Sequence, residues 1–280
     1  HGAEVIADRA ALLEACVAAS RDAGAEILKL VAAGFEIETK TDQSPVTVCD
    51  RAAEEIILAA LAQTAPGVPV IAEEEVAAGR IPAHGGTFFL VDPLDGTKDF
   101  VRGGGASTVN IGLIESGAPT LGTIFMPEQR VVHAGVVGAG AWRDDGRERR
   151  SIATRSQSAP LTALVSRSHF NQATADYLEH SVPGCEQVAV GSSLKFCILG
   201  QGDADIYPRL SPTSEWDTAA GHAIVLAAGG RVDGTDGGEL RYGKTAFVNR
   251  GFVATGGWRA PSLAPFLQDF AGGGDLPQGV

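Results

Sequence analysis

The sequence has little positive charge. Its 280 residues carry 22 Lys and Arg against 34 Asp and Glu, which gives a formal net charge of -12 at pH 7. A protein that binds the phosphate backbone of nucleic acid usually presents a basic face to it. The composition therefore argues against a nucleic acid polymer as partner, and an anionic substrate would need bound cations or a few well-placed Lys and Arg side chains.

Cysteine pairs and long apolar runs are also lacking. Cys16, Cys49, Cys185 and Cys197 form no CxxC pair and no spacing typical of a metal site, so we interpret them as reduced, mostly buried thiols of a cytoplasmic protein. No run reaches the ~20 apolar residues of a membrane helix. Charged residues at positions 8, 9 and 14 interrupt the place of a signal-peptide core. We expect no membrane partner, and we interpret His1 either as an added residue or as a sign that the start is trimmed.

The first half of the chain contains a pattern of helices followed by short strands. The spacing of apolar residues predicts helices over residues 5–33 and 47–64. Short apolar runs predict buried strands over 68–72 and 87–91. Residues 107–137 repeat short apolar runs broken by Gly and Pro, which is typical of an antiparallel meander.

The second half alternates strands with helices. The pattern predicts helices over residues 172–180, 193–199 and 217–230, and such alternation places helices on the faces of a sheet. The basic, polar stretch "RDDGRERRSIATRSQSAP" lies between the halves. We therefore predict an α/β (α+β) fold with an N-terminal part over residues 1–150 and a C-terminal part over residues 151–280.

Two aspartates stand at the end of one predicted strand, in "VDPLDGTKDF". Pro93 has no N–H for a sheet, so we expect the strand to end at about Asp92. The spacing to Asp95 puts both carboxylates on one side of a helical turn, and Gly96 permits close backbone approach. The segment 96–101 can begin a helix whose N–H groups favour an anion. The carboxylates of Asp92 and Asp95 would repel each other unless a cation neutralised them, and oxygen ligands suit Mg2+ or Mn2+. The alternative to a metal site is a turn with Asp92 as helix N-cap.

Acids follow two other predicted elements. The triplet Glu73 to Glu75 comes directly after a buried strand, as Asp92 does. If the two strands are neighbours, Glu73, Asp92 and Asp95 meet at one edge of the sheet, where α/β enzymes commonly bind ligands. Asp217 stands at the mouth of a helix rich in small residues. Taken alone, the triplet is also typical of a solvated loop, and Asp217 of a helix N-cap.

Four segments together resemble a known family. "KTDQSPVTVCD", "AEEE", "DPLDGTKDF" and "WDTAAGH", spread from about Lys40 to Gly230, resemble the lithium-sensitive, magnesium-dependent phosphatases that include inositol monophosphatases and 3'(2'),5'-bisphosphate nucleotidases. Inositol monophosphatases usually follow DGT with Thr-Asn, whereas this chain has Lys98 and Asp99. "SRSHF", "GSSLKF" and "YPRL" are also similar to bacterial bisphosphate nucleotidases.

The resemblance implies a layered αβαβα sugar-phosphatase-like fold, two or three Mg2+ ions (or Mn2+), a role in sulfur metabolism and a monomer or homodimer. It implies that metal-activated water attacks the 3'(2')-phosphate of 3'(2')-phosphoadenosine 5'-phosphate directly. The implied metal ligands are Glu73, Asp92, the carbonyl of Leu94, Asp95 and Asp217. The implied catalytic residues are Glu74 and Thr97, which would position the attacking water, and Asp50, which would lie near a weaker third metal. The implied substrate contacts are Gly96, Thr97, Lys98, Ser166, His169, Gly191, Lys195, Arg209 and Asp217.

Two details leave these assignments open. The family's usual Ser before the paired glutamates is Ala72 here, and a third acid, Glu75, follows, so the ligand could shift by one position. Asp50 also fits a helix capping box with Thr47, without any role in catalysis.

Single motifs of the chain also suggest other functions. Haloacid-dehalogenase phosphatases need an acid two positions before Asp95, where this chain has Pro93, so direct attack by water is favoured. "GVVGAGAW" is similar to a dinucleotide-binding glycine motif, but the charged "RDDGRERR" follows it instead of a helix. An inositol-phosphate or sugar-phosphate phosphatase and a non-catalytic nucleotide or metal sensor remain as alternatives.

Overall fold

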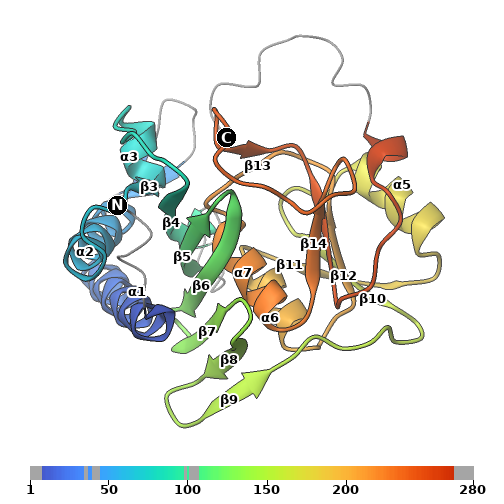
Figure 1. Ribbon diagram of the computed structural model, residues 1–280, viewed down its shortest axis with the longest axis horizontal. Coiled ribbons are helices and arrows are strands. Elements are labelled where there is room, and N and C mark those ends of the chain that lie inside the picture. The colour runs from blue at the N-terminus through green and yellow to red at the C-terminus, as the bar shows by residue number, and fades with distance from the viewer. Residues whose placement is uncertain (1–7, 35–36, 40–44, 98–99, 101–106, 268–280) are drawn as a thin grey trace.

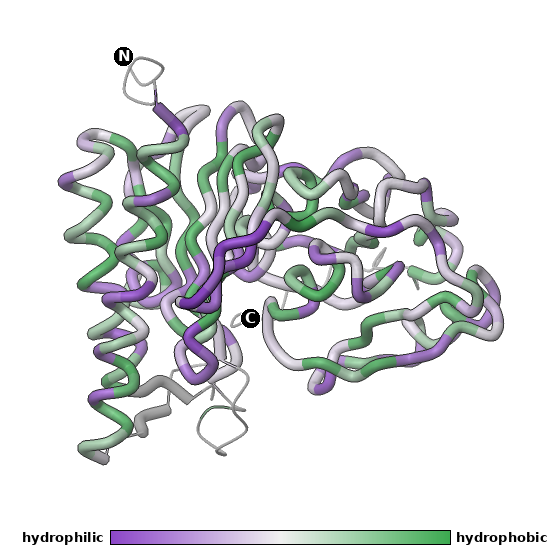
Figure 2. The backbone as a smooth tube through the Cα atoms, turned by 90° about the horizontal axis from the view of Figure 1, so that it is seen from below, coloured by the Kyte–Doolittle hydropathy of each residue, from purple (hydrophilic) through white to green (hydrophobic). Residues whose placement is uncertain are grey.

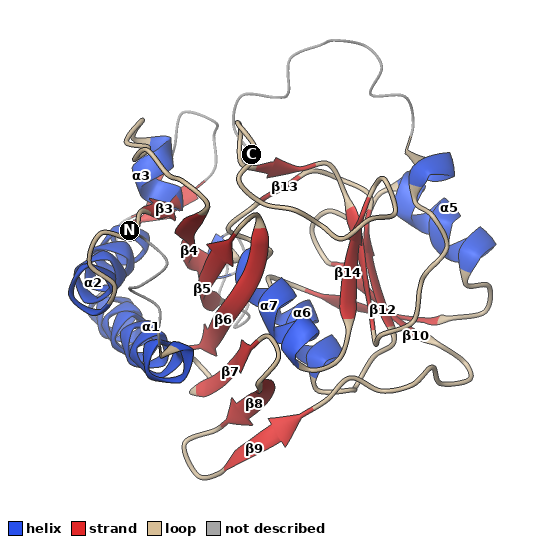
Figure 3. Ribbon diagram, in the orientation of Figure 1, coloured by secondary structure: helices blue, strands red, loops and turns tan. Residues whose placement is uncertain are grey.

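The computed structural model describes residues 8–34, 37–39, 45–97, 100 and 107–267, and it has five layers (Figure 1). A helix pair, a seven-stranded sheet, two central helices, a five-stranded sheet and an outer helix follow one another across the molecule (Figure 3). The helices of these layers are α1 (Arg9–Ala33) with α2 (Val48–Thr64), α6 (Leu194–Gly200) with α7 (Ala219–Ala227), and α5 (Gln172–Ser181). The expected αβαβα layering is confirmed.

The first sheet has the strand order β3-β4-β5-β6-β7-β8-β9. Its strands are β3 (Val70–Ala72), β4 (Thr87–Asp95), β5 (Thr108–Glu115), β6 (Ala118–Met126), β7 (Val131–Val136), β8 (Gly140–Asp144) and β9 (Arg149–Ile152). β3 and β4 are parallel and the other neighbours are antiparallel, so the expected meander is confirmed.

The expected end of β4 at Asp92 is wrong. The strand pairs with β5 up to Asp92↔Asn110, shifts register, and pairs once more at Asp95↔Thr108. Pro93 falls within the irregularity, where the ladder does not need its missing N–H. Both aspartates therefore belong to the strand, one on each side of a bulge.

The second sheet has the order β11-β10-β12-β16-β14. Its strands are β10 (Thr162–Ser166), β11 (Glu186–Val190), β12 (Ile206–Arg209), β14 (Arg231–Gly234) and β16 (Phe252–Thr255). Short pairs form between β1 (Ile37–Thr39) and β2 (Pro45–Thr47), and between β13 (Thr213–Ser214) and β15 (Val248–Asn249). A five-residue helix, α3 (Glu73–Ala77), follows β3, and a short 3-10 helix spans Ala264–Phe266. The division at residue 150 stays a prediction, and β9 runs across it.

The central helix α7 packs very closely on the first sheet. A Cβ added to Gly112 of β5 would lie 2.8 Å from the backbone nitrogen of Ala220. Gly122 of β6 likewise faces the backbone of Ala220. Only glycine permits this approach, so the small residues fix where α7 begins relative to β5 and β6.

The helix pair covers the opposite face of the first sheet, and apolar and polar colours alternate along both helices (Figure 2). The side chain of Asp8 caps α1 by accepting the N–H of Ala11, and Gly34 closes the helix at φ 78°. Gly24 lies against the ring of Phe125. No helix in these described ranges is long and apolar enough to cross a membrane.

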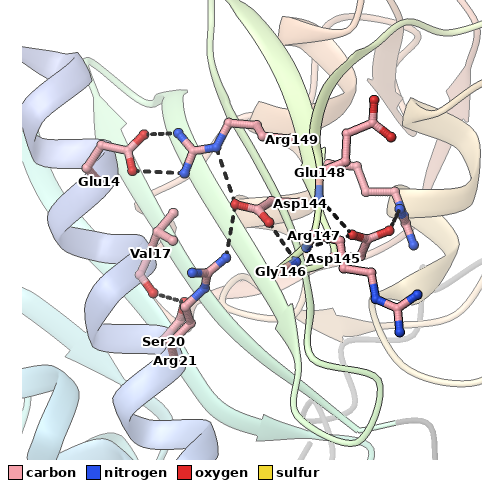
Figure 4. Close-up of polar contacts among 11 residues, drawn as sticks. Glu14, Val17, Ser20, Arg21, Asp144, Asp145, Gly146, Arg147, Glu148 and Arg149 are labelled. Atoms are coloured by element: carbon pink, nitrogen blue, oxygen red, sulfur yellow. Dashed lines mark hydrogen bonds and ion pairs between the residues drawn. The ribbon is translucent and has the colours of Figure 1, made fainter.

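Ion pairs connect α1 to the hairpin of β8 and β9, which carries the polar "RDDGRERR" segment (Figure 4). Arg149 bonds Glu14 at 2.5 Å and also lies 3.4 Å from Asp144, while Arg21 reaches Asp144 at 3.1 Å. The Arg149 guanidinium stacks 3.7 Å from the centre of the Trp142 ring. This charged stretch therefore forms a paired surface hairpin.

Candidate active site

Two parallel strands bring the predicted acids to one edge of the first sheet. Ala72 pairs with Val91, so Glu73 and Asp92, which follow them, lie side by side as expected. They open onto a cavity of about 240 Å3 between the two sheets. Its lining includes Glu73, Asp92, Leu94, Asp95, Gly96 and Thr97 on one wall, and Ser166, Ser168, His169, Gly191, Ser192, Ser193, Lys195, Arg209, Thr213, Ser214 and Asp217 on the other.

The aspartates of the cavity have raised pKa values. Burial, followed by the charges of Glu73, Asp95 and Asp217, holds the pKa of Asp92 well above its ordinary value. Burial, followed by the charges of Asp95 and Glu73, also holds the pKa of Asp217 well above its ordinary value. Burial also raises the pKa of Asp95, although the Lys195 ammonium opposes the shift. These acids crowd one another, and a cation among them would relieve the repulsion.

Backbone donors hold each of these three aspartates. Leu94 N–H donates to Asp92 Oδ1 at 3.0 Å, Ser193 N–H donates to Asp95 Oδ2 at 2.5 Å, and Ser214 N–H donates to Asp217 Oδ2 at 3.0 Å. Each carboxylate has a second oxygen with its own lone pairs.

The chemistry of these donors fits a hard divalent cation such as Mg2+, which prefers carboxylate and carbonyl oxygens. As the side chains stand, the described residues contain no group of three or more His, Cys, Asp or Glu placed to hold a metal. The carboxylates would have to turn their second oxygens toward a shared ion.

The hydroxyl of Thr97 joins two of the predicted positions. Thr97 Oγ1 lies 2.8 Å from the carbonyl oxygen of Leu94 and 3.1 Å from Asp50 Oδ1. Asp50 is 3% exposed and comes from the first turn of α2, so the fold brings it across from the helix layer. The side chain of Thr47, its alternative capping partner, lies outside the described residues.

The acidic triplet divides into three roles. Glu73 lines the cavity, whereas Glu75 bonds Arg80 at 2.6 Å. Glu74 donates its N–H to Glu54 Oε2 at 2.9 Å. The geometry therefore favours Glu73 as the acid that faces the cavity.

Glu54, which the motifs do not indicate, lies next to the site and accepts the N–H of Glu74 without lining the cavity. It is 3% exposed, and burial, together with the charges of Glu73 to Glu75, raises its pKa to about 7. It stands one helical turn after Asp50 on α2. In the sequence, the sign of Glu54 is its spacing of one helical turn from Asp50, which puts two acids on the same face of the helix.

The opposite wall carries cations and hydroxyls. Arg209 is 8% exposed and donates to Ser166 Oγ at 3.3 Å and to the carbonyl of Pro212 at 3.1 Å. Its buried Nε finds no hydrogen-bond partner within the part of the chain that the structure describes. Lys195 is 3% exposed, and its ammonium donates to the carbonyls of Val190 and Ser192. This wall can therefore receive an anion.

The predicted substrate contacts gather here with one exception. Ser166, His169, Gly191, Lys195 and Arg209 all line the cavity. Gly96 lines it too. Lys98 lies outside the described residues, as do positions 99 and 101 of the predicted helix over 96–101.

A layered fold with strand-end acids facing an anion-binding wall is the arrangement of a phosphatase. The model of the inositol monophosphatase family matches residues 8–265, and this chain belongs to that family.

Several relatives with curated names are 3'(2'),5'-bisphosphate nucleotidases. The chain is 41% identical over 247 residues to the 3'(2'),5'-bisphosphate nucleotidase CysQ of Salmonella typhimurium, covering 87% of this chain and 99% of the relative. It is 42% identical to the protein of that name from Buchnera aphidicola, covering 84% and 90%. Among solved structures, CysQ from Bacteroides thetaiotaomicron, described as a bacterial member of the inositol monophosphatase family, superimposes with a TM-score of 0.75 at 33% identity, covering 89% and 98%.

Proposed function

We propose that this chain is a 3'(2'),5'-bisphosphate nucleotidase that hydrolyses 3'(2')-phosphoadenosine 5'-phosphate to AMP and phosphate. The observation that carries the proposal is the pairing of two walls in one cavity. Crowded acids on one side suit metal ions, and a buried, incompletely bonded Arg209 on the other suits a second phosphate. The relatives named as nucleotidases support the choice of substrate.

Two or three Mg2+ ions, with Mn2+ as a substitute, fit the acidic wall. Glu73, Asp92, Asp95, Asp217 and the carbonyl of Leu94 would hold them, since all supply oxygen ligands around the cavity. Bound there, the ions would lower the pKa of a water molecule and offset the charge of the scissile phosphate. Inhibition by low-millimolar lithium follows from the family resemblance.

Thr97, Asp50 and Glu74 orient the attacking water in this proposal. When Thr97 donates its hydroxyl hydrogen to Asp50 Oδ1, the Thr97 oxygen turns a lone pair toward the cavity and can accept a hydrogen from the water. Glu74 would take up the released proton, and its backbone is held by Glu54.

The second wall recognises the rest of the substrate. Arg209 would bind the 5'-phosphate with its planar guanidinium, and the positive charge of Lys195 on the same wall would attract that phosphate as well. Ser166, His169 and Gly191 would line the space for the nucleoside, and Gly96 would meet the scissile phosphate. Lys98 is proposed as a further substrate contact on the family resemblance alone.

We place the protein in the cytoplasm as a monomer or homodimer that acts in sulfur metabolism. None of its four cysteines, all of which lie in the described ranges, forms a disulfide, which suits a reducing compartment. Its partner is a small phosphorylated molecule.

The test compares phosphate release from three substrates in the presence of Mg2+. We expect the highest kcat/KM for 3'-phosphoadenosine 5'-phosphate, and lower values for inositol 1-phosphate and fructose 1,6-bisphosphate. Preference for either of the latter two would overturn the nucleotidase assignment in favour of an inositol-phosphate or sugar-phosphate phosphatase.

A further inference from the structure

Asp217 comes from a different part of the fold than Asp92 and Asp95, so something must fix the distance between them. Asp92 and Asp95 belong to β4 of the first sheet, whereas Asp217 stands between β13 and α7. A shared metal site needs its oxygens at set distances, and an error of 1 Å is large on that scale. The residues around Asp217 show how its place is held.

One segment, residues 241–249, contacts the chain on both sides of Asp217, and we call it the strap. On one side, the buried carboxylate of Glu215 accepts the N–H groups of Gly243 at 2.8 Å and Lys244 at 3.1 Å. It also pairs with the Lys244 ammonium at 2.6 Å. Glu215 is 0% exposed, so these contacts satisfy a fully buried charge.

On the other side of Asp217, the hydroxyl of Thr218 receives two bonds from the strap. Tyr242 Oη lies 3.2 Å from Thr218 Oγ1, and Asn249 Nδ2 lies 2.9 Å from it. The backbone of Glu215 adds a third link, because its N–H donates to the carbonyl of Phe247 at 2.7 Å. The strap therefore holds the residues that flank Asp217.

The other end of the strap is attached to the first sheet. Tyr242 N–H donates to the carbonyl of Gly117 at 3.0 Å, and Arg241 Nη2 donates to the carbonyl of Ser116 at 2.5 Å. Ser116 and Gly117 form the turn between β5 and β6, and β5 pairs with β4 at Asp92 and Asp95. A continuous set of bonds thus runs from the strand that carries two cavity acids to the turn that carries the third.

We propose that Glu215, with Lys244, is a positioning residue that sets Asp217 against Asp92 and Asp95 by anchoring the strap. The inference rests on the proposed function in so far as the acids bind Mg2+. Glu215 itself does not line the cavity, so it acts through the strap. Residues that orient ligands from outside the ligand set typically change metal affinity about 10-fold to 100-fold when they are replaced.

The test measures Mg2+ affinity by titration calorimetry in Glu215→Gln and Lys244→Met, at a temperature well below unfolding. We expect the Mg2+ dissociation constant of Glu215→Gln to rise about 10-fold, and that of Lys244→Met to rise in the same direction by less. The matched control is Glu26→Gln on α1, which removes an acid that pairs with the exposed Lys29 at 3.0 Å and should leave the affinity unchanged.

A lowered unfolding temperature with unchanged Mg2+ affinity in both variants would show that Glu215 is structural only, and would overturn the proposal. If Glu215→Gln does not fold, Lys244→Met decides alone, because Lys244 is 39% exposed and its loss leaves the two N–H donors to Glu215 in place. Calorimetry needs no substrate, so failure of the nucleotidase assignment would leave this result readable.

Discussion

Acids gather in two regions, the surface hairpin of β8 and β9 and the cavity. The pKa of Asp144 in the hairpin is lowered from its ordinary value, whereas the pKa of Asp92 in the cavity is raised. In the hairpin, burial raises the pKa of Asp144, but the Gly146 N–H and the Arg21 and Arg149 guanidinium groups outweigh it, so the pKa lies below its ordinary value (Figure 4). In the cavity, burial and neighbouring acids raise the pKa of Asp92. The difference lies in the partners, since one region supplies a cation for its acid and the other surrounds its acid with more acids.

This contrast explains how a chain of net charge -12 can take a highly charged anion. Where acids attach the β8–β9 hairpin to α1, the chain pairs them with arginine. In the cavity, where acids face one another, our proposal assigns the positive charge to bound metal, and Lys195 and Arg209 lie on the facing wall. Changes in one region, measured against the same change in the other, separate the two kinds of acid.

The largest expected effect comes from removing one acid of the cavity. Asp95→Asn should lower kcat by about 10^3-fold or more, because metal ions contribute several kcal/mol of charge stabilisation in the transition state. Asp144→Asn, the same chemical change in the hairpin, should leave kcat within about twofold. Steady-state kinetics with circular dichroism as a check on folding measures both. Near-normal turnover in Asp95→Asn would remove Asp95 from the metal site.

The next effect concerns the anion-binding wall. Arg209→Lys keeps the charge but loses the planar fork, and we expect KM for the bisphosphate to rise about 10-fold, the loss of one strong charged hydrogen bond. KM for inositol 1-phosphate, which has no second phosphate, should change little. Arg149→Lys in the hairpin is the control. Equal effects on both substrates would place Arg209 at the scissile phosphate instead.

Mg2+ should stabilise the folded chain only by binding to the acids of the cavity. In chelator-treated protein, Mg2+ at 100 times its Kd should add about 2.7 kcal/mol to the free energy of unfolding. Asp144→Asn should show the same gain. Asp92→Asn should show a much smaller gain, and without metal it should be more stable than the parent chain, because a crowded charge is gone. A full Mg2+ gain in Asp92→Asn would contradict the account.

The smallest effect is expected in the hairpin itself. The pKa of Asp144 is lower in the folded chain than in the unfolded chain. Its ionised carboxylate therefore adds to the free energy of unfolding at pH values above the ordinary carboxylate pKa, and this contribution is lost as the pH falls through the pKa of the folded chain. Its partner Arg149 is 41% exposed, so the loss in Asp144→Asn should stay below about 1 kcal/mol at pH 7 and shrink toward pH 3. Urea unfolding at the two pH values measures it, and a larger loss at pH 3 would reverse the sign we assign.

Much of this site could be predicted from local sequence. Glu73, Asp92 and Asp95 follow apolar runs, and parallel strands bring their ends together. Three features could not be predicted, because each depends on contacts between distant parts of the chain. β4 continues past Pro93 since β5 pairs beyond the bulge, Glu54 meets Glu74 across two elements, and Glu215 finds its partners 28 and 29 positions away. Local periodicity carries no information about such pairings.

The most direct test of the central claim is phosphate release from 3'-phosphoadenosine 5'-phosphate by the parent chain, first with chelator and then after Mg2+ is added. The account predicts no release with chelator and full activity once Mg2+ returns, because the acids of the cavity need a cation before they can act on an anion. Release that continues undiminished in chelator, or no release in either condition, would contradict it.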